Sequence, residues 1–444
     1  MYKNLKTERA QDMQKEQSIW HPLTQHKTHP GMIALRKAQG AVLTDMTGKE
    51  YIDGIASWYT SAYGHCHPYI IECVSQQMQQ LDQVVFSSFT HQPALELSEE
   101  LLKILPGNQQ KLFFSDNGST SVEVAIKMAL QYWFNKGEKK STLIAFKDGF
   151  HGDTFGAMSV SGLSVYNGAF KEYSLDVLRL SVPNADNYKE VVLQLEDWLK
   201  HNNVAAFIYE PLVQGAAAMK MHCPEHLDAL LQVCHTYDVL CIADEVMTGF
   251  GKTGKNFASE YMSVQPDLIC LSKALTAGLI PMAITTCTQD VYNAFYDDSV
   301  AKGFFHGHTY TANPLACAAA LAGVRLLQSK DIKRQINKIA ESHRRFSNRL
   351  QAYTYCKNVR QKGVILAFEL DIPMERYGSL RNELYTFFMN NGVFLRPLGN
   401  TIYILPPFVI TDHQLEKIYR LIEEAIRTFT MQYTKHKASV ATDL

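Results

Sequence analysis

The sequence predicts an α/β fold, with a mainly parallel central sheet in a large domain and a small α+β domain built from both ends of the chain. Three observations support this prediction. The chain has 444 residues, of which 46% are hydrophobic, and this suits one large and one smaller domain. Short apolar runs alternate with longer amphipathic stretches through the middle of the chain. The two ends follow a different pattern.

The central strands are predicted from short apolar runs that are mostly bounded by polar residues. Strands that alternate with helices indicate a mainly parallel sheet covered on both faces, in which the strands are apolar throughout. Apolar residues at the i, i+3, i+4, i+7 spacing over 122–133 predict one of the helices. The four predicted strands are LIAF (143–146), VAAFIY (204–209), VLCIAD (239–244) and DLICL (267–271).

The ends of the chain are predicted to form a separate small domain. Residues 40–53 are typical of a hairpin with Met46, Thr47 and Gly48 in the turn. The tail contains a helical stretch, the strand GVILAFEL, a second helix and two strand-like segments, VFLRP and IYILPP. We expect residues 1–70 and 330–444 to form the small domain together, and residues 71–329 to form the large one.

Charge and cysteine content narrow the class of protein. The 43 basic and 44 acidic residues nearly cancel, which gives no reason to expect nucleic acid or a membrane as partner and favours small-molecule substrates. The nine cysteines are scattered without a CxxC pair, so neither a metal site nor a disulfide framework is predicted. Residues 1–17 are polar and lack the apolar stretch of a signal peptide, so we expect a cytoplasmic protein.

The segment ADEVMTGFGKTGK (243–255) places an acidic pair at the carboxyl end of an apolar strand, with a glycine-rich loop behind it. Ligands of parallel sheets bind beyond the carboxyl ends of the strands, so Asp244 is a candidate functional residue. A strand that ends in a solvated carboxylate and a flexible loop explains this segment about equally well when it is taken alone.

Lys273, in LSKAL, follows the next predicted strand and has apolar and small neighbours. Poor solvation there lowers the pKa of its amine and makes it a nucleophile toward aldehydes. For an arbitrary lysine, a charge that reaches water along the alkyl chain is the better explanation. Here, however, Asp244 ends a neighbouring strand, and an amine with a carboxylate is what a Schiff-base cofactor requires.

The segment SDNGSTSVEVAIKMA (115–129) is a candidate phosphate site. Asp116, Asn117, Gly118 and Ser119 lead into a helix, whose first amide groups and dipole favour an anion. Gly118 permits a close approach of the backbone, and Ser119 adds a hydroxyl donor. An ordinary helix cap explains the same residues, and both interpretations can hold together.

Three further positions are weaker candidates. Phe150, in FHGD, follows a predicted strand and is placed to stack on a cofactor, and GHTY (307–310) offers a hydroxyl to a phosphate. For either segment alone, a structural role is the better explanation. Arg396 lies between two apolar stretches and requires an anion, for which a substrate carboxylate and a structural salt bridge are equally good explanations.

These segments occur in the order found in the class-III aminotransferases, and the chain resembles that family over nearly its whole length. The resemblance implies fold-type I enzymes that use pyridoxal 5′-phosphate (PLP) and that form homodimers with active sites at the subunit interface. The five segments are the NGS turn (117–119), GFHGDTFGAMSVSG (149–162), ADEVMTGFGKTG (243–254), LSKAL (271–275) and GHTYTANPLACAAA (307–320).

The resemblance also implies roles for individual residues. Lys273 is expected to hold PLP as an imine, and Asp244 to pair with the nitrogen of the pyridine ring. The phosphate is expected to be held by residues of both subunits, namely Gly118 and Ser119 together with His308 and Thr309 of the partner subunit.

Within the family, the chain looks most like the members that aminate 8-amino-7-oxononanoate in biotin biosynthesis. By this likeness, Trp58, Phe150 and Gly307 line the substrate pocket and Arg396 binds the carboxylate of the oxo acid. The segments that carry the likeness are IWHP (19–22), SWYTSAYGHCHP (57–68), FSSFTHQPA (86–94) and the pair VFLRP and IYILPP.

Three positions depart from the members that use S-adenosylmethionine as amino donor. Those members usually read WHPYT where this chain has Leu23, tyrosine where it has Phe150, and arginine where it has Lys252. All three positions are expected in or near the substrate pocket. Leu23 offers a sulfonium group neither a hydroxyl nor an aromatic face. S-adenosylmethionine remains the expected donor, and lysine is the alternative.

Other functions fit part of the pattern. The nearest is a class-III transaminase acting on ornithine, 4-aminobutyrate or a diamine, although Trp58 and Arg396 favour a long oxo acid. An aminomutase or decarboxylase can use the same scaffold, since a fold does not fix a function. Intact Lys273 and Asp244 argue against a non-catalytic binding protein. The glycine loop does not open an early βαβ unit, as a dinucleotide-binding enzyme requires.

Overall fold

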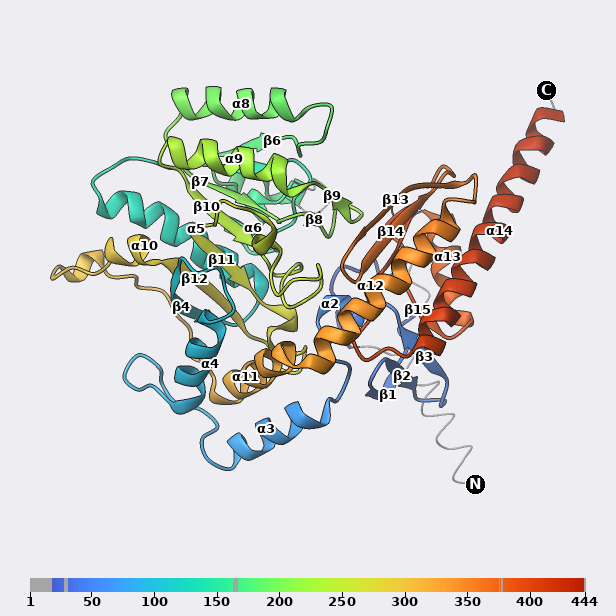
Figure 1. Cartoon of the computed structure of the whole chain (residues 1–444), viewed down its shortest axis with the longest axis horizontal. Helices are drawn as coiled ribbons and strands as arrows, with labels where there is room; N and C mark the ends of the chain where they lie inside the picture. The colour runs from blue at the N-terminus through green and yellow to red at the C-terminus, as the bar shows by residue number, and fades with distance from the viewer. Residues whose placement is uncertain (1–17, 28–30, 163–166, 375, 377, 443–444) are drawn as a thin grey trace.

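The computed structural model describes residues 18–27, 31–162, 167–374, 376 and 378–442 (Figure 1). The segment 1–17, on which the expectation about a signal peptide rests, lies outside these residues. Within the described ranges, no helix is long and apolar enough to cross a membrane. The predicted α/β class is confirmed, because one large sheet has helices on both faces and is accompanied by smaller sheets of four, three and two strands.

A seven-stranded sheet forms the centre of the larger part of the molecule. One strand, β12, is antiparallel to both of its neighbours, and all other pairings in the sheet are parallel. The four strands predicted from apolar runs are confirmed as the adjacent strands β11, β10, β7 and β5. In spatial order the strands are β4 (Gln109–Ser115), β12 (Ala283–Thr288), β11 (Leu268–Leu271), β10 (Leu240–Asp244), β7 (Val204–Tyr209), β5 (Thr142–Phe146) and β6 (Val177–Leu180).

Alternate side chains of this sheet pack into two different apolar clusters. Cys241 and Ala243 of β10 belong to the cluster that contains α8 (Tyr188–His201) and α9 (Pro224–Thr236). Leu240 and Ile242 belong to the cluster built around α5 (Gly118–Asn135), the helix predicted over 122–133. Burial on both faces explains why these strands are apolar throughout.

Two smaller sheets bring the ends of the chain together. The predicted hairpin is confirmed by the antiparallel pairing of β2 with β3. Strand β15 of the tail pairs in parallel with β3, with Val393 opposite Ile52. The segments VFLRP and IYILPP therefore supply strands to different sheets. The sheets contain β1 (Leu35–Gln39), β2 (Val42–Asp45), β3 (Glu50–Asp53) and β15 (Val393–Phe394), and β13 (Cys356–Lys362), β14 (Ile365–Leu370) and β16 (Thr401–Ile404).

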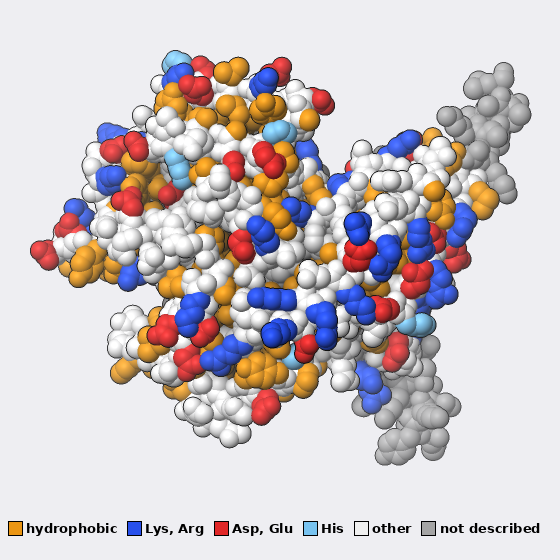
Figure 2. Space-filling model, viewed as in Figure 1, with side chains coloured by type: hydrophobic (Ala, Val, Ile, Leu, Met, Phe, Trp, Pro, Cys, Tyr) orange, Lys and Arg blue, Asp and Glu red, His pale blue; other side chains and the backbone are white. Residues whose placement is uncertain are grey.

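The remaining elements surround these sheets. Figure 2 shows charged side chains of both signs interspersed on one face, and on α12 Arg334 pairs with Asp331 and Arg344 with Glu341. The other helices are α2 (Ala56–Tyr59), α3 (Pro68–Met78), α4 (Gln92–Leu102), α6 (Phe155–Val160), α10 (Gln289–Asn293), α11 (Pro314–Gln328), α12 (Lys330–Leu350), α13 (Ser379–Asn390) and α14 (Asp412–Thr442). The short elements are β8 (Val213–Gln214), β9 (Lys220–Met221), η1 (Gly168–Tyr173), η2 (Ala258–Tyr261), η3 (Lys273–Thr276) and η4 (Val300–Lys302).

Candidate active site

A cavity of about 320 Å³ lies at the carboxyl ends of β10 and β11. This is the edge at which parallel sheets bind ligands. Among the candidates from the sequence, the cavity is lined by Leu23, Trp58, Gly118, Ser119, Phe150, Asp244, Lys273 and Arg396. Residues far apart in the chain therefore meet at one site.

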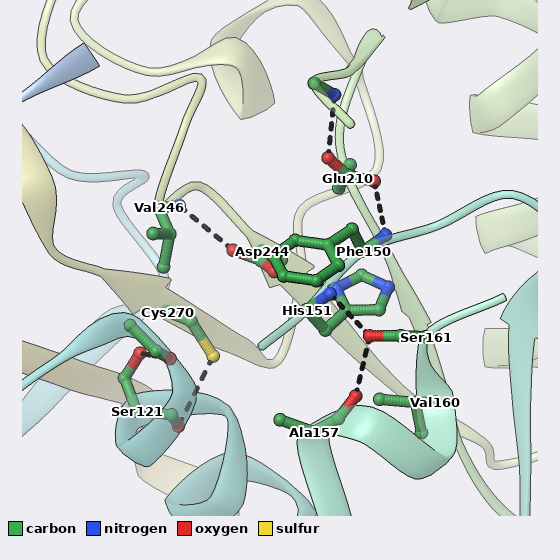
Figure 3. Close-up of polar contacts among 12 residues, drawn as sticks. Ser121, Phe150, His151, Ala157, Val160, Ser161, Glu210, Asp244, Val246 and Cys270 are labelled. Carbon is green, nitrogen blue, oxygen red and sulfur yellow. Dashed lines mark hydrogen bonds and ion pairs between the residues drawn. The ribbon is translucent and has the colours of Figure 1, made fainter. Parts of the chain in front are cut away.

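Asp244 ends β10 and is almost completely buried. Its Oδ2 lies 2.7 Å from Nδ1 of His151, and its Oδ1 accepts a hydrogen bond of 3.0 Å from the amide of Val246 (Figure 3). A buried carboxylate requires such partners. Both oxygens of Asp244 are thus held in a fixed orientation beside the cavity.

Lys273 begins η3, directly after β11, and adopts a left-handed backbone conformation with φ of 51°. Burial lowers the pKa of its amine, and the neighbouring carboxylates Asp244 and Glu210 act in the opposite direction. The Nζ atom lies 5.1 Å from the centre of the Tyr59 ring. The structure therefore provides a desolvated amine next to a buried carboxylate.

The first turn of α5 forms another wall of the cavity. Asn117 is the N-cap, and its side chain accepts a hydrogen bond from the amide of Thr120. Among the described residues, none accepts a hydrogen bond from the amides of Gly118 or Ser119. A Cβ atom at Gly118 would lie 2.8 Å from a methyl group of Val246, so any larger residue would require the Val246 side chain or the backbone to move. The helix cap and the anion site predicted from the sequence are thus compatible.

The loop after β5 brings Phe150 and His151 to the cavity. The amide of Phe150 donates to Glu210 at 3.0 Å, and the amide of Gly215 donates to the other Glu210 oxygen at 2.9 Å (Figure 3). Burial raises the pKa of Glu210 to about 7. No role was predicted for His151 or Glu210, although both line the cavity.

Trp58 lies in a turn with an unusual backbone. Four consecutive residues, Ala56 to Tyr59, have positive φ values of 47°, 46°, 67° and 74°, and none is glycine. Each such residue costs about 1–2 kcal/mol, so the surrounding structure must hold the turn. The turn places the Trp58 ring 4.6 Å from the Arg396 guanidinium carbon.

Arg396 has no ion pair with a carboxylate in the part of the chain that the structure describes. Of the two explanations left open by the sequence, this favours a substrate carboxylate over a structural salt bridge. Two further arginines line the same cavity and were missed by the sequence analysis. Arg376 donates to the carbonyl of Ala216 at 2.8 Å, and Arg381 donates to that of Pro397 at 3.1 Å.

Lys252 lies near the cavity but not in its lining, which is compatible with the expectation that this position lies in or near the substrate pocket. Its side chain does not line the cavity but is completely buried behind it, where Nζ donates to the carbonyl of Gly249 at 3.0 Å. Burial, and next the charge of Lys273, lower its pKa to about 7. The influence of the Lys273 charge on the pKa of Lys252 shows that Lys252 is near the site. Lys252 nevertheless offers no direct contact to a ligand in the cavity.

Gly307, His308 and Thr309 do not line the cavity of their own chain. They lie in the segment between η4 and α11, where the carbonyl of Thr309 accepts a hydrogen bond from Gln83 at 2.8 Å. His308 Nδ1 accepts from the amide of Tyr310 at 3.2 Å. These three candidates therefore lie apart from the eight candidates that line the cavity.

A second group of potential ligand atoms lies at the opposite edge of the sheet. His235, Cys241 and Asp267 have side-chain ligand atoms within 4.8 Å of one another, a grouping that cysteine spacing alone does not indicate. Asp267 already accepts a hydrogen bond from the amide of Cys241 at 2.7 Å, which is a structural role at the amino ends of β10 and β11. This group takes no part in the cavity.

Comparisons with known proteins agree with this geometry. The profile of the family "Aminotransferase class-III" matches residues 23–426. An adenosylmethionine-8-amino-7-oxononanoate aminotransferase from Synechococcus elongatus is 41% identical, covering 92% of this chain and 98% of the relative. One from Staphylococcus aureus is 34% identical, covering 92% and 95%.

Solved structures give the same result. The crystal structure of the adenosylmethionine-8-amino-7-oxononanoate aminotransferase from Methanocaldococcus jannaschii superposes with a TM-score of 0.89 at 30% identity, covering 96% of this chain and 99% of that one. A PLP-bound amine transaminase from an uncultivated Pseudomonas species superposes with a TM-score of 0.86 at 27% identity, covering 93% and 99%.

Proposed function

Because the chain belongs to the class-III aminotransferases, which depend on PLP, we propose that it transfers an amino group to 8-amino-7-oxononanoate and so forms 7,8-diaminononanoate for biotin biosynthesis. The names of the relatives support this acceptor. The structural observation that carries the proposal is Arg396, which faces the cavity beside Trp58 and has no carboxylate partner among the described residues.

The residues of the cavity fit PLP. The desolvated amine of Lys273 suits its aldehyde, the buried carboxylate of Asp244 suits its ring nitrogen, and the free amides of Gly118 and Ser119 suit its phosphate. Phe150 lines the same cavity, and we assign its ring to stack on the cofactor. These features support assigning cofactor binding to the five residues.

PLP supplies an aldehyde that accepts the amino group and a ring that delocalises the electrons left when the substrate's C–H bond breaks. We assign Lys273 as the residue that holds the cofactor and then moves the proton at the substrate carbon as general base and acid. Asp244 keeps a proton on the ring nitrogen, and His151 orients Asp244 through the 2.7 Å contact. Burial of Asp244 and His151 limits the access of water to this proton transfer.

We assign binding of the acceptor to the far side of the cavity. Arg396 binds the carboxylate of the oxo acid, while Trp58 and Leu23 contact its hydrocarbon chain. Arg376 and Arg381 also line the cavity but donate to backbone carbonyls, so we assign Arg396 to the one carboxylate of a long-chain acceptor. Leu23 and Phe150 also contact the amino donor, which we take to be S-adenosylmethionine, with lysine as the alternative.

The protein acts as a cytoplasmic homodimer with shared active sites under this proposal. Gly307 of the partner subunit lines the substrate pocket, and His308 and Thr309 of the partner subunit reach the phosphate. Their position outside the cavity of their own chain supports this assignment. Residues 71–329 then form the large PLP-binding domain, and residues 1–70 and 330–444 form the small domain.

A product assay tests the proposed function. The purified protein is supplied with PLP, 8-amino-7-oxononanoate and each of several amino donors, and the product is identified by mass spectrometry. Formation of 7,8-diaminononanoate supports the proposal. No 7,8-diaminononanoate, together with transfer of the amino group from ornithine, 4-aminobutyrate or a diamine to another oxo acid, would show another class-III transaminase.

A further inference from the structure

We propose that Asp53 is a positioning residue, which holds the left-handed turn 56–59 and so fixes how Trp58 faces Arg396. Asp53 does not line the cavity, and therefore acts only through other residues. The inference rests on the proposed function, because it treats the Trp58–Arg396 pair as the wall that binds the acceptor.

The carboxylate of Asp53 is completely buried at the end of β3 and contacts the turn directly. Its Oδ1 accepts a hydrogen bond of 3.1 Å from the amide of Ile55. Its Oδ2 accepts one of 3.0 Å from the Ser57 hydroxyl and lies 2.8 Å from Nε2 of His65. A buried carboxylate with three polar partners has one favoured orientation.

The turn requires such support because its backbone is unfavourable for L-residues. Two backbone hydrogen bonds close it, from Tyr59 to Ile55 and from Thr60 to Ala56, each 2.9 Å long. Ser57 lies inside the turn and bonds to Asp53, so the carboxylate joins the turn to the sheet. Loss of this bond frees the turn to relax toward ordinary backbone angles.

His65 anchors the same carboxylate from the other side. Its backbone exchanges two hydrogen bonds with Gly40, of 2.9 and 2.8 Å, where the chain connects β1 and β2. Its ring nitrogen also lies 3.3 Å from the Ser57 hydroxyl. Asp53, Ser57 and His65 therefore form one cluster that is fixed to the four-stranded sheet.

Asp53 also determines the position of Arg396 through the backbone. Asp53 lies opposite Phe394 in the parallel pairing of β3 with β15, and Arg396 follows Phe394 by two residues. The amide of Gly54 donates to the carbonyl of Phe394 at 3.1 Å. Trp58 and Arg396 are thus both placed relative to one residue, and their separation of 4.6 Å depends on it.

The test is the substitution Asp53→Asn in the full-length, PLP-loaded enzyme. Asparagine has one acceptor oxygen, so it can accept from the Ile55 amide or from Ser57 and His65, but not from both sides. We expect KM for 8-amino-7-oxononanoate to rise on the order of tenfold with little change in kcat, because substrate binding is altered and Lys273 is not. The emission of Trp58, obtained by subtracting the spectrum of a matching Trp58→Phe protein, should shift and become more accessible to acrylamide.

Asp45→Asn is a matched control. Asp45 ends β2 in the same sheet and accepts four hydrogen bonds, from Thr47 twice, Lys49 and Tyr51, but it does not contact the turn. This variant should leave both KM and the Trp58 emission unchanged. If Asp53→Asn does not fold, His65→Leu replaces it as the loosening variant, and His65→Gln, which keeps a donor, should restore wild-type behaviour.

The proposal is overturned if the loosening variant leaves the Trp58 emission unchanged, or if Asp45→Asn raises KM as much as Asp53→Asn does. A wild-type enzyme that does not aminate 8-amino-7-oxononanoate would contradict the proposed function instead. In that case the Trp58 emission, which needs no substrate, still decides whether Asp53 holds the turn.

Discussion

His151 Nδ1 lies 2.7 Å from Oδ2 of Asp244, and both side chains are buried. The two residues are 93 positions apart in the chain and come from the loop after β5 and the end of β10. His151 is itself fixed, because its amide donates to the Ser161 hydroxyl at 2.8 Å. His151 thus orients the Asp244 carboxylate, and a hydrogen bond to Ser161 holds His151 in place.

Asp244→Asn should lower kcat by roughly 100-fold or more, because the charge opposite the ring nitrogen is lost while the shape is kept. Single-turnover kinetics measure this effect. Glu245→Gln is the matched control, since Glu245 is adjacent and buried but bonds to Thr248 and Ser259 outside the cavity. It should reduce stability without a comparable loss of rate. Near-normal turnover in Asp244→Asn would remove Asp244 from the proposed role.

Borohydride reduction of the PLP-loaded protein should attach the cofactor permanently to Lys273. Its amine is buried next to two carboxylates, which suits imine formation. Lys252 is an internal comparison, because it also has a lowered pKa but is completely buried and does not line the cavity. Peptide mapping by mass spectrometry checks the site. Label on Lys252 or any other lysine would show that the assignment is wrong.

Arg396→Ala should raise KM for the oxo acid by roughly tenfold or more, as expected from losing about 1.5–3 kcal/mol of charge-assisted binding. The same substitution should have little effect on a neutral amide analogue of the acceptor. Steady-state kinetics with both compounds measure the difference. A variant that loses stability but keeps its affinity for the acid would instead support a structural role for Arg396.

The amino donor is tested by half-reactions, in which the PLP form is mixed with S-adenosylmethionine or with lysine and its spectrum is followed. The double substitution Leu23→Tyr and Phe150→Tyr should increase the rate with S-adenosylmethionine by roughly tenfold or more, because each added hydroxyl contributes about 0.5–1.5 kcal/mol. No increase would mean that these positions do not contact the donor. Reaction with lysine alone would establish the alternative donor.

Stability should fall as the pH drops from about 6.5 toward 4, because burial lowers the pKa of His343 to about 4. The unfolded chain binds this proton near pH 6.5, whereas the folded protein does not until about pH 4, so acid favours unfolding. The loss from this one residue is about 2 kcal/mol at about pH 5. Urea unfolding of wild type and His343→Gln at two pH values measures it, and the variant should show a weaker dependence.

His235 is the control for this prediction, since its shift has the opposite sign. A hydrogen bond to Asp267 raises the pKa of His235, so its contribution to stability is present below pH 6.5 and is lost as the pH rises. His235→Gln should therefore destabilise the protein mainly in acid. If the stability of His343→Gln and His235→Gln depended on pH in the same way, the opposite pKa shifts assigned to His343 and His235 would be wrong.

The large sheet could be predicted because its physical cause is visible in the sequence. Strand β7 agrees with the predicted run at both ends, and burial on its two faces makes all of its residues apolar. Lys273 and Asp244 were found for a related reason, since each follows an apolar strand and the strands are neighbours. Local composition was sufficient for both conclusions.

Other features depend on contacts that composition does not encode. The left-handed turn at 56–59 contains no glycine, which is the usual sign of positive φ. His151 gains its role only from a partner far along the chain. The loop that contains Lys252 looks flexible because of its glycines, yet Phe250, Lys252 and Thr253 are completely buried, and burial is decided by what packs around the loop.

The pairing of β3 with β15 has a consequence for how the chain is made. About 340 residues separate Ile52 from its partner Val393. At a synthesis rate of about 5–20 residues per second, the edge of β3 waits roughly 20–70 s for its neighbour to leave the ribosome. During that interval Asp53 lacks the strand that leads to Arg396, so the substrate side of the pocket is the last part of the site to be assembled on a nascent chain.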